Sequence, residues 1–447
     1  MRSGTQNTSR ILVNPNSEMT TRPNQRDLGD ERMNLDPLTY EPVGDKKNSD
    51  FFDEYRTKIY ERRRSSGIDD LLGPMRGFVV QVDTGDAIAY LHELYLMTPY
   101  RLVASFIDQT HKVYILESQP KFPRFILIEP LDVNYEDEIK RFNMLYPLAQ
   151  QKPNSRYVGE IFATQDMQET CKILESHNIR FHYPGEVDNR LFANDHFLFS
   201  FPSDFTYNRI GYTSFGFEDY DALQLGQPFN LTDEQIASLN QQEQLGHDHG
   251  LTELISGVDH MATRILSGER EDAILEFLTM VNYYFWGAYN IAAMNSSTNV
   301  NRNHRVDDDK ESPAKVFTAN NTPSFVNSFE NHPMPTEDFV RNYGRRMHHV
   351  AYEVIDGDHP SGVKNVDYVV GKLAELGIPF LAHVVGECKD DPDLKQIFSK
   401  HSKYSLLITE YVERCHDFEG FFTKQNVASL TEAAGHDERY DHGHVFD

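Results

Sequence analysis

Hydrophobic and polar residues alternate along several short stretches of the chain, which is the pattern of a β-strand with one buried face. In residues 346–356, apolar side chains recur at every second position from Val350 to Val354, and the alternate positions begin with His349. Residues 257–265 and 404–414 alternate in the same way. The sequence therefore predicts strands with one face against a helix and the other lining a polar cavity.

The predicted elements recur in the order strand, helix and three strands, and such a unit begins near residues 77, 155, 257 and 346. Four βαβββ units predict an α+β fold in which paired units form two open barrels. In the first half we predict strands over 77–82, 102–107, 113–117, 125–128, 156–163, 179–182, 196–201 and 209–214, and helices over 87–95 and 167–176. In the second half we predict strands over 258–265, 315–318, 324–328, 346–356, 380–385, 394–399 and 404–414, and helices over 269–284, 366–376 and 426–434.

These elements divide the chain into two domains and three less regular segments. The domains cover 77–215 and 257–435, and 295–313 is expected to be a polar, mobile insert in the second. In the linker, Thr232 followed by Gln235 predicts a short capped helix. The remaining segments are a disordered or helical extension over 1–70, a linker over 216–250 and a flexible tail over 436–447.

The amino-acid composition argues against nucleic-acid binding and membrane binding. The 447 residues include 43 basic and 69 acidic side chains, for a formal net charge of −26. Such a charge repels nucleic acid and anionic membrane surfaces. We also find no apolar run near the roughly 20 residues that span a bilayer, and no apolar segment of a signal peptide at the N-terminus. We therefore expect a cytoplasmic protein that binds neither nucleic acid nor membrane.

The cysteines support the same expectation. Cys171, Cys388 and Cys415 have neither metal-finger nor redox spacing. They fit a reducing cytosol and a fold without a disulfide framework.

Two histidines and a carboxylate are the candidate chemistry. Strand alternation places His260 and Arg264 on one face of the first strand, while His349 and Glu410 lie on the polar faces of two others. Two imidazoles and one carboxylate on three strands predict a facial metal triad with open coordination positions, which suits Fe(II). Glu413 is the rival carboxylate, but it lies on the opposite face from Glu410.

Other candidate ligands are less well placed. The cluster at 247–249, His-Asp-His, is expected to be a solvated turn. In the first half, Glu160 is placed at the position of His349 and has no histidine partner. We therefore expect the metal only in the second half.

Paired βαβββ units with these motifs resemble the vicinal oxygen chelate superfamily, and within it the 4-hydroxyphenylpyruvate dioxygenases. The resemblance covers 257–435 well and 77–215 at the level of fold. It is carried by Val258-Asp-His-Met-Ala, His348-His-Val-Ala-Tyr, Lys395-Gln-Ile-Phe-Ser-Lys400, Glu410-Tyr-Val-Glu-Arg414 and Phe422-Thr-Lys-Gln-Asn-Val427.

The resemblance implies two vicinal oxygen chelate domains of the glyoxalase and bleomycin-resistance type, with Fe(II) held by His260, His349 and Glu410 in the second. It implies an oxidoreductase that uses O2 and a small-molecule substrate, a 2-oxo acid or another oxygen chelator. A homo-oligomer is compatible with the sequence. The resemblance places Gln396, Phe398, Phe422 and His348 around the substrate.

Two departures from the family's motifs bear on the substrate. The family has Gln at the position of His348 in this chain, and an aromatic residue at the position of Val427. We therefore expect a wider pocket mouth, and a best substrate other than 4-hydroxyphenylpyruvate. Two alternatives stay open: another metal enzyme of the superfamily, such as a ring-cleaving dioxygenase or an isomerase, and a binding protein without catalytic activity.

Overall fold

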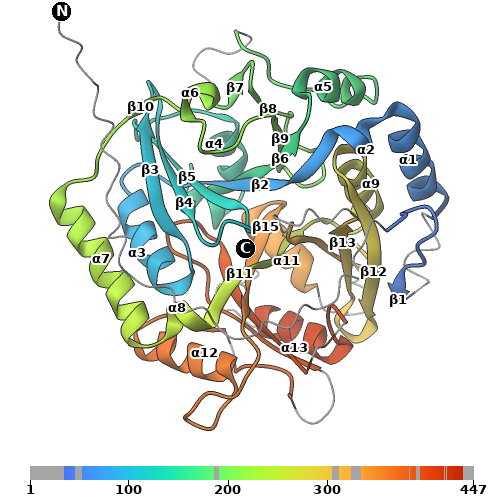
Figure 1. The fold of residues 1–447 in the computed structure, drawn as a ribbon. Helices are drawn as coiled ribbons and strands as arrows, with labels where there is room; N and C mark the ends of the chain where they lie inside the picture. Colours follow the sequence, from blue (N-terminus) through green and yellow to red (C-terminus); the bar gives the residue numbers. More distant parts are fainter. Residues whose placement is uncertain are drawn as a thin grey trace, which may run out of the picture.

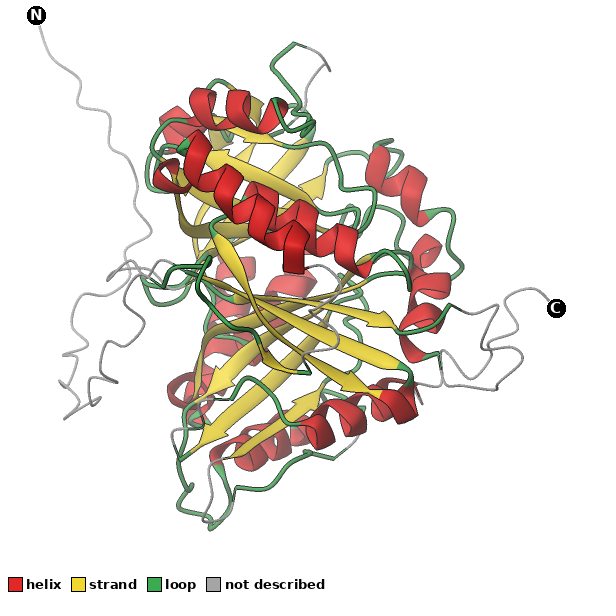
Figure 2. Cartoon of the chain, turned by 90° about the vertical axis from the view of Figure 1, so that its right-hand side faces the viewer, coloured by secondary structure: helices red, strands yellow, loops and turns green. Residues whose placement is uncertain are grey.

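The computed structural model describes residues 35–45, 53–185, 191–304, 312–323, 334–381, 383–388, 393–416, 418 and 420–435. The predicted strand over 324–328, the predicted tail and most of the N-terminal extension lie outside these residues. The described chain forms two mixed sheets with helices packed around them, and the sheets lie one above the other in Figure 2. The predicted α+β class is therefore confirmed.

The first half forms a nine-stranded sheet in the order β10-β3-β4-β5-β2-β6-β9-β8-β7. Its two units meet at the antiparallel pair β2 and β6, in the centre of the sheet. The first unit contains β2 (Leu72–Gln81), α3 (Ala87–Met97), β3 (Arg101–Ile107), β4 (His111–Glu117) and β5 (Arg124–Pro130). The second contains β6 (Arg156–Thr164), α5 (Met167–Glu175), β7 (Ala193–Asn194), β8 (Phe197–Phe199) and β9 (Arg209–Thr213).

The second half forms an eight-stranded sheet in the order β1-β12-β13-β14-β11-β15-β17-β16. Here the antiparallel pair β11 and β15 is central. The first unit contains β11 (Ile255–Arg264), α9 (Arg270–Met280), β12 (Tyr283–Ile291), β13 (Ser296–Asn303) and β14 (Ala314–Asn320). The second contains β15 (Arg346–Val354), α12 (Asn365–Glu375), β16 (Asp393–Phe398) and β17 (Ile408–Cys415).

The remaining elements connect and cover these sheets, and Figure 1 shows most of them toward the edge of the molecule. The helices α11 (Pro335–Tyr343) and α13 (Lys424–Gly435) pack beside the second sheet. The others are β1 (Val43–Gly44), α1 (Asp53–Ser66), α2 (Ile68–Leu71), α4 (Glu138–Asn143), α6 (Tyr220–Leu223), β10 (Gln227–Pro228), α7 (Asp233–Asp248) and α8 (Leu251–Leu254), with 3-10 turns at Ala149–Gln151 and Ala292–Met294.

The predicted linker contains a long helix instead of a short one. Thr232 and Gln235 form the predicted capping box at the start of α7. The helix then continues to Asp248 and packs along α3, where the Ser238 hydroxyl hydrogen-bonds with His92. Contact with α3 offsets the weak amphipathic pattern of this segment, because tertiary packing stabilises helices more than local propensity does.

Two predictions for the second half are wrong. The helix over 269–284 ends at Met280, because Tyr283 and Tyr284 start β12. Within the expected mobile insert, Ser296–Asn303 forms β13, and six of its eight residues are buried, while residues 305–311 lie outside the described part of the chain. The side-chain amide of Asn299 donates to the Phe317 carbonyl and that of Asn301 to the Lys315 carbonyl of the neighbouring strand, so both side-chain nitrogens have a partner inside the protein.

Two further predicted strands, over 179–182 and 380–385, are reduced to isolated bridges. Phe181 pairs with Ser200 in the first half, and Phe380 pairs with Ser399 at the equivalent place in the second. In the second unit of each half, the strand that follows the helix is therefore reduced to isolated bridges in the same way.

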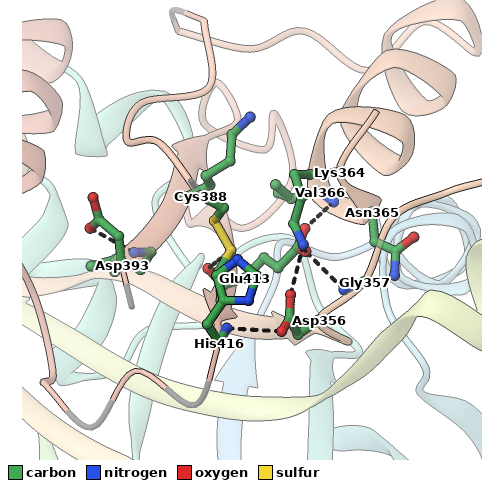
Figure 3. The surroundings of a disulfide bond; sticks show 12 residues. Asp356, Gly357, Lys364, Asn365, Val366, Cys388, Asp393, Glu413 and His416 are labelled. Carbon is green, nitrogen blue, oxygen red and sulfur yellow. Dashed lines mark hydrogen bonds and ion pairs between the residues drawn. A yellow bond between two sulfur atoms is a disulfide. The ribbon is translucent and has the colours of Figure 1, made fainter. Parts of the chain in front are cut away.

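The expectation of free thiols is wrong for two of the three cysteines. Cys388 and Cys415 form a disulfide, with 5.7 Å between their Cα atoms, and Cys171 is free and buried (Figure 3). The two positions are separated by 27 in the sequence, so their proximity is not visible there; it arises when β17 pairs with β16. Among the described residues, no helix is both long and apolar enough to cross a membrane.

Candidate metal centre and substrate cavity

Three predicted ligands converge on one point inside the second sheet. The Nε2 atoms of His260 and His349 lie 3.1 and 3.0 Å from the same carboxylate oxygen of Glu410, and 3.2 Å from each other. Strand register explains the convergence, because Ala351 pairs with His260 on one side and with Glu410 on the other. The side chains of three neighbouring strands therefore meet on one face.

The spacing of these atoms fits a metal ion. Ligands about 2.1 Å from a metal and at right angles to one another lie about 3 Å apart. Both carboxylate oxygens of Glu410 are buried and receive no well-directed hydrogen bond among the described residues. A buried carboxylate of this kind is costly unless it is paired or coordinates a cation. The three side chains therefore have the composition and spacing of a facial triad.

Burial and charge act in opposite directions at this centre. Burial alone would lower the pKa of His260, but the charge of Glu410 and the hydrogen bond that His260 donates to Asp259 raise it to about 9. Burial also lowers the pKa of His349, against the attraction of Glu410. For Glu410, burial would raise the pKa, yet the two histidines hold it at about 2. The carboxylate is thus charged, as a metal ligand must be.

A β-bulge orients the first histidine. Val258 pairs with Tyr352 and His260 with Ala351, so Asp259 is an extra residue on β11. Its carboxylate accepts from His260 Nδ1 at 2.6 Å and from Arg414 at 3.0 Å. A hydrogen bond of this kind fixes the ring and leaves Nε2 facing the cavity.

A second bulge brings His348 into the cavity. Ala262 pairs with His349 and Thr263 with Met347, so His348 is the extra residue on β15. Its Nδ1 lies 2.8 Å from Nδ1 of His349. If His349 binds a metal through Nε2, its proton is on Nδ1, and Nδ1 of His348 is then the acceptor of this hydrogen bond. Strict alternation would place the His348 side chain on the apolar face of the sheet. The bulge turns it toward the cavity instead.

The remaining predicted pocket residues line the same cavity, which has a volume of about 50 Å³. Phe398 packs on His349 with ring centroids 4.8 Å apart, and Phe422 packs on His260 at 5.2 Å. Gln396 is buried, and its side-chain oxygen has no hydrogen-bond partner among the described residues. The structure therefore brings together all seven residues that the sequence singled out.

The sequence analysis did not assign the other polar side chains of the cavity. Strand alternation had placed Arg264 on the face of His260, but gave it no role. Hydroxyl groups on the neighbouring strands and helices complete the cavity wall, and two of them belong to β13, which the sequence did not predict. The hydroxyl residues are Ser296, Thr298, Thr318, Thr336 and Thr431.

Val427 lines the cavity together with Leu430 and Thr431 of the same helix, α13. The wider pocket mouth expected from the aromatic-to-valine departure stays a prediction.

The rival ligands lie elsewhere. Glu413 accepts from the backbone amides of Gly357 and Val366 and pairs with Lys364 at 3.2 Å, away from the triad (Figure 3). Glu413 also lies near Asp356 and Cys415, but the disulfide makes that sulfur unavailable as a thiolate ligand.

The cluster at 247–249 is also separate. It lies at the end of α7, where His247 pairs with Glu253 at 2.9 Å. Neither histidine of this cluster belongs to a metal-binding group among the described residues.

Equivalent positions in the first half hold glycine. The register of β2, β6 and β9 matches that of β11, β15 and β17, including both bulges. Gly77 then corresponds to His260, Gly159 to His349 and Gly211 to Glu410. Phenylalanine rings fill the space: a Cβ on Gly211 would lie 2.8 Å from Phe199. Among the described residues of this half no metal-binding group is found.

The sequence placement of Glu160 at the His349 position is wrong by one residue, which transfers its side chain to the other face of the sheet. There Glu160 forms a buried ion pair with Lys315 of the second half.

Comparison with known proteins supports the fold. No protein-family model and no curated protein matches the sequence. A triple mutant of 4-hydroxymandelate synthase from Streptomyces coelicolor is similar in structure, with a TM-score of 0.54 and 13% identity over 81% of this chain and 98% of that one. A fusion protein of a xylose isomerase-like TIM barrel and 4-hydroxyphenylpyruvate dioxygenase is also similar in structure, with a TM-score of 0.51 and 10% identity. The match covers 85% of this chain and 58% of that one. The chain therefore has the two-barrel fold of the vicinal oxygen chelate proteins.

Proposed function

We propose that this protein is an Fe(II)-dependent dioxygenase that acts on a 2-oxo acid. The observation that carries the proposal is the convergence of His260, His349 and Glu410 within 3.0 to 3.2 Å. When bound, ferrous iron would supply adjacent open positions for an oxygen-chelating substrate and for O2. The structural neighbours named above, a synthase and a dioxygenase fusion, are consistent with oxidative chemistry.

The surrounding residues would hold the ligands and keep water out. Asp259 and His348 each accept a hydrogen bond from the Nδ1 of one ligand histidine, which keeps both Nε2 atoms aimed at the metal position. Phe398 and Phe422 cover the two rings. A dry, ordered cavity lets the protein orient the substrate and exclude competing reactions.

The cavity favours a small 2-oxo acid over 4-hydroxyphenylpyruvate. A buried phenol would need partners for its hydroxyl, since leaving that group unpaired costs about 1–3 kcal/mol. We expect short aliphatic 2-oxo acids to give higher kcat/KM than the aromatic acid.

Metal content and gas exchange test the proposal. Protein purified anaerobically and loaded with Fe(II) should contain one iron per chain, and should consume O2 and release CO2 with a 2-oxo acid. His349→Ala should lose most of the iron while keeping its fold. His247→Ala, a histidine outside the cavity, should keep both iron and activity. Full iron occupancy in His349→Ala would refute the ligand assignment, and O2 uptake without CO2 release would favour ring cleavage instead.

A further inference from the structure

The cavity contains a cation next to the triad. Arg264 follows His260 by four residues on β11 and faces the same side, and its guanidinium is buried. It lies two residues beyond Ala262, which pairs with His349, so the two positions are about 7 Å apart along the sheet. The charge is therefore within reach of a short substrate chelated at the triad.

Neighbouring contacts hold Arg264 in this position. Its guanidinium donates to the Pro335 carbonyl at 3.1 Å and stacks over the Phe339 ring, 5.1 Å from its centroid. His348 packs on the same ring at 5.0 Å. The two side chains therefore share one aromatic platform at the same end of the cavity.

His348 presents a hydrogen-bond donor there. When His349 binds the metal through Nε2, its Nδ1 carries a proton and donates to Nδ1 of His348, so the proton of His348 is on Nε2. That atom is buried and has no hydrogen-bond partner among the described residues. A buried donor without a partner is unfavourable, and a ligand acceptor would relieve the cost.

Hydroxyl groups extend this polar end. Arg264 pairs with Thr318 across β11 and β14, and Thr318 pairs with Thr298 across β14 and β13. The three side chains form a row on the cavity face, separate from the row that holds the triad. Among the described residues lining the cavity, Arg264 carries the permanent positive charge.

We propose that Arg264 and His348 form an anion subsite, and that the substrate is a short 2-oxo dicarboxylic acid. This inference rests on the proposed function, because the triad must bind the 2-oxo acid end. The second carboxylate would accept from the Arg264 guanidinium and from His348 Nε2. Arg264 is then the residue that sets specificity.

Direct binding tests the subsite without turnover. Fe(II)-loaded protein is titrated anaerobically with 2-oxoglutarate, a dicarboxylate, and with 2-oxohexanoate, a monocarboxylate of similar length, and the visible absorption of the iron chelate is followed. One charge-assisted contact corresponds to a difference in Kd of between about tenfold and a hundredfold. The dicarboxylate should bind more tightly by such a factor. Arg264→Met should abolish the preference by weakening the dicarboxylate alone, and Arg264→Lys should keep part of it.

Arg270→Met is the matched control. Arg270 is a partly buried arginine six residues further along, paired with Glu271 outside the cavity, and its loss should leave both affinities unchanged. Equal weakening of both acids by Arg264→Met would overturn the subsite and assign Arg264 to the chelating end. Tighter binding of 2-oxohexanoate by the wild type would also overturn it. If neither these acids nor any other 2-oxo acid produced a chelate in the iron-loaded protein, the proposed function itself would fail.

Discussion

At the scale of single residues, two extra positions in the central strand pair shape the candidate metal centre. Asp259 and His348 are each the additional residue of a β-bulge, and each lies next to a ligand histidine in the sequence. In a regular strand both side chains would lie on the apolar face. The bulges turn them toward the ligands, where they orient the two imidazole rings.

Replacement of Asp259 by Asn tests this orienting role. The amide keeps the size of the side chain but weakens its acceptance from His260 Nδ1, so Fe(II) affinity should fall by roughly tenfold to a hundredfold. Competition with a chelator of known affinity measures the change.

Asp356→Asn is the control, because Asp356 pairs with Lys364 outside the cavity. An unchanged iron affinity in Asp259→Asn would show that the hydrogen bond does not position the ligand.

At the scale of elements, the same strand arrangement gives a cavity in one half and a solid core in the other. The three ligand positions of β11, β15 and β17 correspond to Gly77, Gly159 and Gly211 in the first half. Without side chains there, the β9 backbone approaches Gly159 closely, and Phe197 and Phe199 pack over Gly211. The first half therefore has no room for a ligand set.

Gly159→Ala should destabilise the protein by about 1–3 kcal/mol. An added methyl group would overlap the backbone carbonyl of Arg209, and a central strand cannot move away from its partner without cost. Urea denaturation gives the free energy of unfolding of each variant.

Gly371→Ala is the matched glycine variant. Gly371 lies in α12 with open space around its Cα, so the same change should stabilise the protein by about 1 kcal/mol. Equal effects of the two substitutions would contradict the close approach at Gly159.

The disulfide joins the end of β17, the strand of Glu410, to the segment before β16. Closing a loop with a sequence separation of 27 residues removes chain entropy worth about 3–4 kcal/mol. Cys388→Ser should therefore lower the free energy of unfolding under oxidising conditions by up to that amount.

Reductant should destabilise the wild type by the same amount and leave Cys388→Ser unchanged. Wild-type protein with identical unfolding curves in the presence and absence of reductant would contradict the prediction.

At the scale of the whole molecule, the two halves share one continuous core. Side chains from the outer faces of both central strand pairs meet in it, and the Tyr157 hydroxyl contacts Met261 across the boundary at 3.4 Å. Within this apolar contact, Glu160 of the first half pairs with Lys315 of the second, and both are buried. Burial lowers the pKa of Lys315, while the neighbouring charge of Glu160 opposes the shift.

Replacing one partner of this ion pair should lower the free energy of unfolding more than replacing both partners. Glu160→Gln alone leaves an uncompensated ammonium group between the halves and should destabilise the protein by about 3–5 kcal/mol. The double variant Glu160→Leu, Lys315→Met removes both charges at similar volume and should recover most of that loss. Urea denaturation of the single and double variants measures the coupling energy between the two side chains. Losses in the free energy of unfolding that are fully additive would contradict the predicted coupling.

The pattern along the chain was enough to predict the alternation of most strands, the cap at Thr232 and the faces that carry His260, His349 and Glu410. These features depend on residues that are close in sequence, where side-chain period and turn chemistry act directly. For the same reason the α+β class followed from the repeated order of elements.

Tertiary structure alone decided the rest. The two bulges, the burial of polar β13, the disulfide and the partner of Glu160 all depend on which strand lies beside which, and those contacts join residues far apart in the chain. A shift of one residue in register exchanges the faces of a strand, which is how Glu160 came to be misplaced. Local patterns contain no information about the hydrogen-bond acceptor of the buried Asn299 side-chain amide, because that acceptor is the carbonyl of Phe317 on the next strand.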